Sequence, residues 1–145
     1  MKCHEIMKTS VECCDPNDEI REVARRMAEK NIGFMPVRDE VGRVLGTVTD
    51  RDLVVRVLAT DRDLETTRVH EVMSQPIIAC RPTDDLHEAE RLMSRHRVSR
   101  VICVDEHQRP VGVISLSDVA DVERGARAAT VLRNISHREA GIIQH

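Results

Sequence analysis

The spacing of hydrophobic and polar residues changes several times along the first half of this chain. Apolar residues three and four positions apart predict an amphipathic helix over residues 18–30. Short apolar runs at residues 34–37 and 43–48 lie on either side of a polar turn, which predicts a β-hairpin. A second helical pattern begins at Thr49 and ends near Leu58. An extended segment before the first helix completes the order strand, helix, strand, strand, helix.

The second half of the chain repeats this order. Residues 4–52 align without a gap to residues 70–118, and 14 of these 49 pairs are identical. This level of identity indicates an internal duplication with an offset of 66 residues. The duplication predicts a second set of elements: a strand at 77–80, a helix at 84–96, strands at 100–104 and 110–114, and a helix from 115.

The duplication also defines the expected domain organisation. Each half alone would bury little surface, so we expect two β-α-β-β-α repeats in a pseudo-twofold arrangement that share a core, an α+β fold. We expect a helix at residues 126–134 and a mobile segment at 136–145. The predicted parts are repeat 1 at 1–59, a polar connector at 60–68, repeat 2 at 69–122, and a partly helical C-terminal tail at 123–145.

Composition excludes several classes of partner. Phe34 is the sole aromatic residue, and the formal charge of −3 comes from interspersed acidic and basic residues, so nucleic-acid binding is not expected. No apolar run is long enough to cross a membrane, and no secretory signal is present. Five cysteines, an odd number, fit reduced thiols. We therefore expect a cytoplasmic protein that uses neither nucleic acid nor a membrane.

One motif occurs in both halves, at the junction between a strand and a helix. It consists of a glycine, two strand residues, a hydroxyl residue, two variable residues and an aspartate. In the first half these residues are Gly46, Thr49 and Asp52. A glycine within a strand often marks the close approach of another backbone or a ligand. The hydroxyl and carboxylate fit either a capping box or a ligand site at a helix N-terminus.

The second copy of the motif, at Gly112, Ser115 and Asp118, makes the pattern resemble the CBS domains, which are named after cystathionine β-synthase. An Asp-Pro or Arg-Pro pair before each long helix also matches that family. The resemblance covers residues 1–122 and is to the tandem form, called a Bateman module, in its stand-alone bacterial type. Residues 97–118 are similar to the last repeat of the γ subunit of AMP-activated protein kinase.

The resemblance implies an adenosine nucleotide ligand, such as AMP, ADP, ATP or NAD, in clefts between the two repeats. The family's aspartate binds both ribose hydroxyls, and its Ser or Thr faces the ribose or the first phosphate. These roles fall on Asp52 with Thr49, and on Asp118 with Ser115. A carboxylate suits this role because it accepts hydrogen bonds through two oxygens and donates none.

The two sites are expected to differ. The family's phosphate-binding basic residues align with Arg97 and Arg100 of the second repeat, whereas the first repeat has Asn31 and Phe34 there. In the resembled kinase subunit a histidine precedes the second arginine, and here that position is Ser99. The resemblance therefore implies that Asp52, served by the two arginines, holds the stronger site, although both arginines also fit an exposed surface role.

Other residues around these motifs complete the predicted sites. Asp50 and Arg51 differ from their counterparts Leu116 and Ser117, so they are expected to distinguish the first site from the second. Aliphatic residues are expected to contact the adenine, and each also fits a role in the core. The candidates are Val11 and Ile32 on one side, and Ile77 and Val98 on the other.

Neither catalysis nor metal binding is expected. The cysteines and histidines lack the paired spacing of zinc ligands, and Cys14 and Cys80, at matched positions, fit buried small hydrophobic residues. No nucleophile with a base and an orienting group can be assembled. The sequence therefore predicts a non-catalytic regulatory module that signals to an unknown effector protein. The alternative is a structural dimer whose nucleotide sites are vestigial.

A homodimer is expected in either case, because CBS modules commonly pair through their helices. Two helices carry apolar residues beyond a single face. These residues are Val54, Val55 and Leu58 in the first repeat, and Val119, Ala120 and Val122 in the second.

Overall fold

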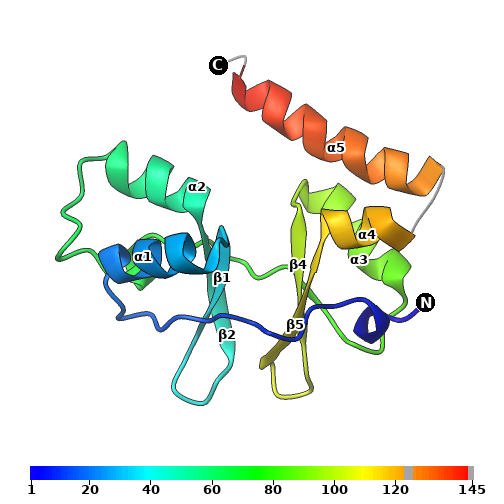
Figure 1. Cartoon of the computed structure of the whole chain (residues 1–145), viewed down its shortest axis with the longest axis horizontal. Helices are drawn as coiled ribbons and strands as arrows, with labels where there is room; N and C mark the ends of the chain where they lie inside the picture. The colour runs from blue at the N-terminus through cyan, green and yellow to red at the C-terminus, as the bar shows by residue number, and fades with distance from the viewer. Residues whose placement is uncertain (123–125, 144–145) are drawn as a thin grey trace. The chain divides into compact units, whose positions relative to one another are not determined.

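The predicted hairpin of the first repeat forms from β1 (Phe34–Arg38) and β2 (Val44–Thr49), which pair antiparallel (Figure 1). The helix α1 (Ile20–Lys30) precedes this hairpin, and its buried residues Ile20, Val23 and Met27 have the predicted helical spacing. β2 leads directly into α2 (Asp50–Asp52), which continues as the π-helical segment η2 (Leu53–Leu58). These elements come from a computed structural model that describes residues 1–122 and 126–143.

The second repeat has the same order of elements. Its hairpin pairs Arg100 with Ser115, as the first pairs Phe34 with Thr49, so the register follows the 66-residue offset. The prediction of an α+β fold with two such repeats is confirmed. The first repeat begins with a short turn, η1 (Cys3–Glu5). The second comprises the equivalent turn η3 (Val69–Glu71), β3 (Ala79–Cys80), α3 (Leu86–His96), β4 (Arg100–Val104), β5 (Pro110–Ser115) and α4 (Leu116–Val122).

The first strand of each repeat is shorter than predicted, and in repeat 1 it is reduced to one bridge. Cys14 pairs with Val37, whereas β3 pairs with β4 through two residues. Proline explains the difference. In the second repeat the Ile102 N–H donates to the Ile78 carbonyl at 3.3 Å, but the equivalent residue of the first repeat, Pro36, has no N–H.

The compact units of the structure do not coincide with the sequence repeats, because each repeat contributes its N-terminal segment to the other unit. In unit 1, Lys8 forms an antiparallel bridge with Val113. In unit 2, Ser74 forms the equivalent bridge with Thr47. Unit 1 consists of Met1–Ser10, Ile78–Glu106 and Pro110–His145, and unit 2 of Val11–Ile77 and His107–Arg109.

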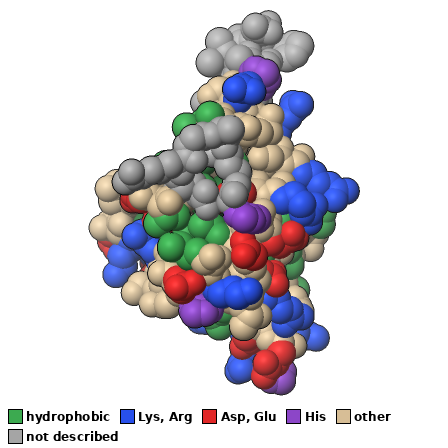
Figure 2. Space-filling model, turned by 90° about the vertical axis from the view of Figure 1, so that its right-hand side faces the viewer, with side chains coloured by type: hydrophobic (Ala, Val, Ile, Leu, Met, Phe, Trp, Pro, Cys, Tyr) green, Lys and Arg blue, Asp and Glu red, His purple; other side chains and the backbone are tan. Residues whose placement is uncertain are grey.

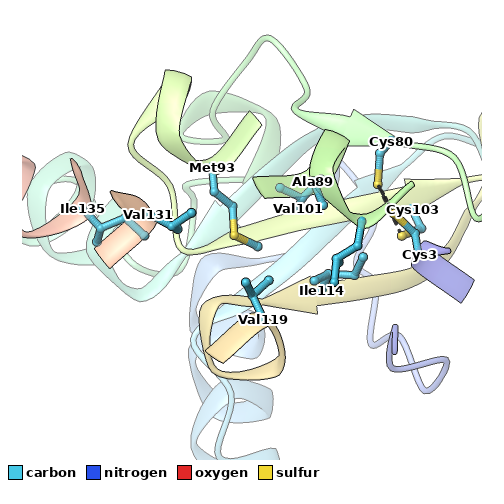
Figure 3. Packing of buried hydrophobic residues seen from close by; sticks show 11 residues of the cluster. Cys3, Cys80, Ala89, Met93, Val101, Cys103, Ile114, Val119, Val131 and Ile135 are labelled. Carbon is cyan, nitrogen blue, oxygen red and sulfur yellow. Dashed lines mark hydrogen bonds between the residues drawn. The ribbon is translucent and has the colours of Figure 1, made fainter. Parts of the chain in front are cut away.

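Each unit has its own cluster of buried hydrophobic residues, and each cluster draws on both repeats. In unit 1, Cys3 of the first repeat packs with residues of the second (Figure 3). In unit 2, Val69 and Val72 of the second repeat pack with residues of the first. The two repeats therefore share their cores as predicted, in that each buried cluster contains residues of both repeats.

The cysteines are part of these clusters. Cys14 and Cys80 are 2% and 4% exposed, which confirms their prediction as small buried residues. The Cys80 sulfur lies 3.8 Å from that of Cys3 and 3.6 Å from that of Cys103 (Figure 3), and all five cysteines are free thiols. Burial raises the pKa of the Cys14 thiol to about 12, so this thiol stays protonated and unreactive.

The C-terminal part differs from its prediction. The helix expected at residues 126–134 is present, but α5 (Ala126–Ile143) continues through most of the segment predicted to be mobile. The helix is therefore longer than predicted and ends at Ile143. The cause is packing: Val131 and Ile135, four residues apart on one face, are buried in the unit 1 cluster.

The charged surface agrees with the sequence. On the face that Figure 2 shows, Lys and Arg side chains alternate with Asp and Glu, without a basic stripe. Among residues 1–122 and 126–143, no helix has the length and apolar content needed to span a membrane.

Candidate functional site

The repeated motif forms a capping box in unit 2. The Thr49 N–H donates to Asp52 Oδ2 at 2.9 Å, and the Asp52 N–H donates to Thr49 Oγ1 at 3.1 Å. The predicted capping arrangement is therefore present at the start of α2. It uses only one carboxylate oxygen, so it does not exclude a second role for Asp52.

The other oxygen, Asp52 Oδ1, faces two polar side chains. The Ser74 hydroxyl donates to it at 3.1 Å, and Arg56 Nε lies 3.6 Å away. Arg56 is held in place because its Nη1 also donates to the Met73 carbonyl at 3.1 Å. Asp52 is 7% exposed, so a nearly buried carboxylate has one oxygen fixed by the helix and one oxygen directed to polar groups.

Gly46 allows Ser74 to reach this position. A Cβ atom at Gly46 would lie 2.7 Å from the Ser74 carbonyl oxygen, which belongs to the backbone and has little freedom to move. Ser74 and Thr47 of β2 form an isolated antiparallel bridge here: the Ser74 N–H donates to Thr47 O at 2.7 Å, and the Thr47 N–H donates to Ser74 O at 3.1 Å. The predicted close approach of a backbone at this glycine is confirmed.

Unit 1 contains the same capping box, but the groups beside the other carboxylate oxygen differ, since Lys8 replaces Ser74 and Val122 replaces Arg56. The Ser115 N–H donates to Asp118 Oδ2 at 2.9 Å, and the Asp118 N–H donates to Ser115 Oγ at 3.3 Å. The group facing Asp118 Oδ1 is the Lys8 ammonium, at 3.6 Å. Lys8 is the counterpart of Ser74 under the 66-residue offset. A Cβ atom at Gly112 would meet the side chain of Met7, whose counterpart Met73 also lies near Gly46.

Each unit thus places a hydrogen-bond donor beside a carboxylate oxygen. A sugar diol has hydroxyl groups that both donate and accept, so it can donate to the carboxylate oxygen and accept from the neighbouring serine or lysine. The side chain of Asp118 is 11% exposed and that of Asp52 is 10% exposed, so both carboxylates are similarly screened from water. The carboxylates that would accept bonds from a ligand are therefore closely similar in the two units, whereas the neighbouring donors, Ser74 and Lys8, differ.

The sequence interpretation missed the residues that face these oxygens, namely Lys8, Arg56 and Ser74. The internal duplication could have pointed to two of them, because Lys8 and Ser74 are aligned with each other and directly follow the identical pair Met7 and Met73. Their roles depend on the exchange of N-terminal segments between units, which the hydrophobic pattern does not reveal.

Asp50 and Arg51 are both exposed at the start of α2. The Asp50 N–H donates to the Gly33 carbonyl at 3.0 Å, and its carboxylate lies against Gly33, where a Cβ atom would overlap it. In unit 1 the equivalent bond joins Leu116 to Ser99 at 2.8 Å. An acidic side chain therefore occupies a position in unit 2 that is apolar in unit 1.

The four aliphatic candidates for adenine contact divide between the units. Val11, Ile32 and Ile77 belong to unit 2, and Val98 belongs to unit 1. All four are half-buried. They thus have the partial exposure that a contact with a ligand requires, and they remain candidates.

Arg97 adopts a backbone conformation that is unfavourable for its side chain. It terminates α3 with φ 55° and ψ 48°, in the left-handed region, as Asn31 terminates α1 with φ 53° and ψ 49°. Asparagine adopts this conformation more readily than other non-glycine residues.

Replacing Arg97 with asparagine is therefore expected to separate stability from binding. Arg97→Asn should stabilise the fold by about 0.5–1 kcal/mol, because it relieves the unfavourable backbone conformation. It should also weaken the binding of phosphorylated ligands. Denaturant unfolding and calorimetry measure the two effects, and a variant that is stabilised without any loss of affinity would assign Arg97 to the surface.

Arg100 is exposed at the beginning of β4, directly opposite Ser115 in the β4–β5 ladder. Side chains opposite each other in an antiparallel ladder lie on the same face of the sheet. Arg100 Nη1 donates to Ser99 Oγ at 3.4 Å, a long contact that leaves the guanidinium other donors. Both predicted basic residues are therefore accessible to an anionic ligand.

The described residues offer no site for a metal ion. Within residues 1–122 and 126–143, no group of three or more His, Cys, Asp or Glu side chains has an arrangement that could hold one.

Comparison with known proteins agrees with this structure. The family described as CBS domain matches residues 3–59 and 69–125, which are the two halves of the duplication. The chain belongs to the CBS-domain family. The description of the matching family names no catalytic activity.

Similar proteins have the same organisation. The CBS domain-containing protein YhcV of Bacillus subtilis is 37% identical over 133 residues, which are 91% of this chain and 93% of YhcV. A conserved CBS domain protein of Thermoplasma acidophilum, TA0289, has a similar fold, with a TM-score of 0.83, 22% identity, and coverage of 95% of this chain and 76% of its own.

A third protein was crystallised with ligands. The CBS domain pair of protein MJ0100, in complex with 5′-methylthioadenosine and S-adenosyl-L-methionine, has a TM-score of 0.75 and 24% identity. The match covers 84% of this chain and 94% of that pair. At this identity the likeness concerns the fold.

Proposed function

We propose that this protein is a non-catalytic regulatory module that binds an adenosine nucleotide: AMP, ADP, ATP or NAD. The observation that supports this proposal is the repeated geometry around Asp52 and Asp118. In each unit a nearly buried carboxylate uses one oxygen to cap a helix and presents the other beside a hydrogen-bond donor. Capping uses Oδ2 alone, while Oδ1 interacts with Ser74 in unit 2 and with Lys8 in unit 1, and its further lone pair is proposed to accept from a ligand.

The ribose diol is the group most suited to this position. The two ligands of the MJ0100 pair both contain an adenosine with free 2′ and 3′ hydroxyls, and neither carries a phosphate. What these ligands share with AMP or ATP is thus the base and the diol. We assign the diol to Asp52 with Thr49 and Ser74, and to Asp118 with Ser115 and Lys8.

The preference for a phosphate would come from other residues. Following the resemblance to the kinase subunit, we assign the phosphate contacts of the ligand on Asp52 to Arg97 and Arg100. A guanidinium binds phosphate oxygens through two parallel hydrogen bonds, which the counterparts Asn31 and Phe34 cannot do. The Asp52 site is therefore proposed as the stronger one. Lys8 gives the Asp118 site one cation, but that cation already pairs with the carboxylate.

The adenine is proposed to contact Val11, Ile32, Ile77 and Val98. With a single aromatic residue in the chain, Phe34, the base would rest on aliphatic side chains and not on a stack of rings. Aliphatic contacts of this kind are favourable for any purine, so recognition of adenine over guanine would fall to backbone groups.

Regulation requires that the ligand bind two conformations of the protein with different affinity. We propose that the protein acts as a homodimer and that an effector protein reads the ligand-induced change. The alternative function, a structural dimer with vestigial sites, would retain the capping boxes and bind no nucleotide.

Removal of one ribose hydroxyl is expected to weaken binding. 2′-Deoxy-AMP loses one hydrogen bond to an ionised carboxylate, which costs about 1.5–3 kcal/mol, or roughly ten- to a hundredfold in affinity. Titration calorimetry with AMP and 2′-deoxy-AMP measures the difference, and 5′-deoxyadenosine, which keeps the diol, serves as a control for changes at the other end of the ribose. Equal affinity for AMP and its 2′-deoxy form would limit the carboxylates to helix capping.

A further inference from the structure

Three buried thiols meet in the core of unit 1. Cys3 lies in η1, Cys80 on β3 and Cys103 on β4, and all three side chains belong to the same buried cluster. The Cys80 sulfur lies 3.8 Å from the Cys3 sulfur and 3.6 Å from the Cys103 sulfur (Figure 3). A disulfide bond is about 2.05 Å long. The thiols are therefore unbonded, yet close enough for a side-chain rotation to join two of them.

Unit 2 shows that packing does not require three thiols at this place. Under the 66-residue offset Cys80 corresponds to Cys14, whereas Cys3 and Cys103 correspond to Val69 and Val37. Both valines are fully buried in the cluster of unit 2. The same place in the core is thus filled equally well by valine. What unit 1 has in addition is the chemistry of neighbouring thiols, which valine lacks.

The neighbouring thiols also change the ionisation of Cys3. The pKa of the Cys14 thiol in unit 2 is raised to about 12, chiefly by burial. At Cys3 the direction is reversed: hydrogen bonds from the Cys103 and Cys80 thiols stabilise the thiolate and lower the pKa of the Cys3 thiol. The thiolate is the nucleophilic form of cysteine. Cys3 is therefore the member of the cluster that should react first.

Cys3 is also the member that solvent reaches most easily. It lies in a turn of three residues, and its neighbours Lys2, His4 and Glu5 are exposed. A local opening of this turn would bring the Cys3 sulfur to water while the β3–β4 ladder stays intact. An oxidant as small as a peroxide can therefore reach Cys3 without unfolding of unit 1.

The geometry of the sheet selects the partner of Cys3. Cys80 and Cys103 lie directly opposite each other in the parallel ladder of β3 and β4. Neighbouring strands lie about 4.8 Å apart, and opposite side chains leave them in the same direction. A disulfide needs Cβ atoms about 3.5–4.5 Å apart, so a bond between Cys80 and Cys103 would draw the strands together. Cys3 is outside the ladder and can adjust, so the pairing of Cys3 with Cys80 is favoured.

We propose that Cys3 and Cys80 form a reversible disulfide when the protein is oxidised by a hydroperoxide. The Cys3 thiolate attacks one peroxide oxygen, the O–O bond breaks, and the leaving hydroxide takes a proton to become water, which leaves a sulfenic acid on Cys3. The Cys80 sulfur then attacks the Cys3 sulfur and the S–OH bond breaks. The Cys80 proton goes to the departing hydroxide as a second water. Two thiols are oxidised by two electrons in all, and one peroxide is reduced.

The disulfide would tie the N-terminal segment, residues 1–10, covalently to unit 1. This segment also carries Lys8, whose N–H donates to the Val113 carbonyl at 2.9 Å and whose ammonium lies 3.6 Å from Asp118 Oδ1. In the reduced protein the segment is held by non-covalent contacts and can open. Oxidation would hold Lys8 beside Asp118. The inference rests on the thiol cluster and is independent of nucleotide binding.

Peptide mapping of the full chain tests the pairing. The reduced protein is treated with hydrogen peroxide, remaining thiols are alkylated, and a tryptic digest is analysed without reductant. Trypsin cleaves between all three cysteines, for example after Lys8 and Arg81, so each pairing gives a distinct cross-linked peptide. The Cys3–Cys80 peptide is expected, in a chain that stays at 16.4 kDa on a non-reducing gel, and dithiothreitol should remove it. A Cys80–Cys103 peptide, or no cross-link at all, would overturn the proposal.

Thermal unfolding with matched variants tests the same bond independently. Oxidation should raise the Tm of the wild type by about 5–15 °C, because the bond joins distant residues of the unfolded chain. Cys3→Val and Cys103→Val each introduce the residue that unit 2 has at the matched position, so both variants should fold. Cys3→Val should lose the increase in Tm, and Cys103→Val should keep it. An increase that survives Cys3→Val, or that is lost with Cys103→Val, would contradict the pairing.

Hydrogen exchange tests whether the bond holds the N-terminal segment. The amides of Lys8 and Val113 should exchange at least about tenfold more slowly in the oxidised protein, because the segment no longer opens. The amides of Thr47 and Ser74, which form the equivalent bridge in unit 2, are the control and should keep their rates. Unchanged exchange at Lys8, or equal slowing at both bridges, would overturn the proposed tie.

Discussion

Asp52→Ala is expected to weaken AMP binding at the stronger site by about 10²- to 10⁴-fold. The carboxylate is proposed to accept hydrogen bonds from both ribose hydroxyls, and each such bond to a charged group contributes about 1.5–3 kcal/mol. Arg56 cannot replace it because a guanidinium only donates, and the neutral Ser74 hydroxyl can accept a bond only without the carboxylate's charge. Calorimetric titration of the variant with AMP measures the effect.

Asp118→Ala is the matched control for this change. Each aspartate side chain accepts the N–H of the preceding hydroxyl residue through Oδ2, whereas the second bond of the capping box uses the aspartate's own N–H and is kept in the alanine variant. Each variant should therefore lose about 1 kcal/mol of stability from the one missing bond. Only Asp52→Ala should remove the stronger isotherm. If Asp118→Ala removes it and Asp52→Ala spares it, the assignment of the two sites is reversed, and Arg100 acts beside Ser115, its partner in the β4–β5 ladder.

Arg100→Ala is expected to discriminate between ligands by their phosphates. Loss of the guanidinium should weaken AMP and ATP binding roughly ten- to a hundredfold, because a charge-assisted contact with phosphate is lost. Binding of adenosine, which has no phosphate, should change little. Titrations with adenosine, AMP and ATP measure this difference directly.

An arginine elsewhere in the same unit provides the control. Arg95, exposed near the end of α3, carries the same charge without a predicted role, so Arg95→Ala should leave the affinity for ATP nearly unchanged. Equal losses in the Arg95 and Arg100 variants would indicate a general effect of positive charge. An equal loss for adenosine and ATP in Arg100→Ala would show that Arg100 supports the fold of the site and does not contact phosphate.

Much of the fold follows from periodicity and duplication. The helical spacing gave α1 and α3 within two residues, and the alternation of apolar runs with polar turns gave both hairpins. The registers of the two hairpins are related by the 66-residue offset, because matched sequences favour matched pairings. The capping boxes at Thr49 and Ser115 were also predictable, since a hydroxyl and a carboxylate three residues apart define them.

The remaining features depend on contacts between distant parts of the chain. Ser74 faces Asp52, and Lys8 faces Asp118, only because the N-terminal segment of each repeat packs in the other unit. Local patterns carry no information about such an exchange. The length of α5 was missed for a similar reason, since Ile135 is stabilised by burial in the unit 1 cluster and not by its neighbours in sequence.

Calorimetric titration of the wild-type protein with AMP, ADP, ATP and NAD tests the central claim most directly. The protein should bind at least one of these ligands in a saturable reaction, with a stronger site that is lost in Asp52→Ala. An absence of binding to all four, in protein that circular dichroism shows to be folded, would contradict the claim and leave the repeated carboxylates as helix caps of a structural dimer.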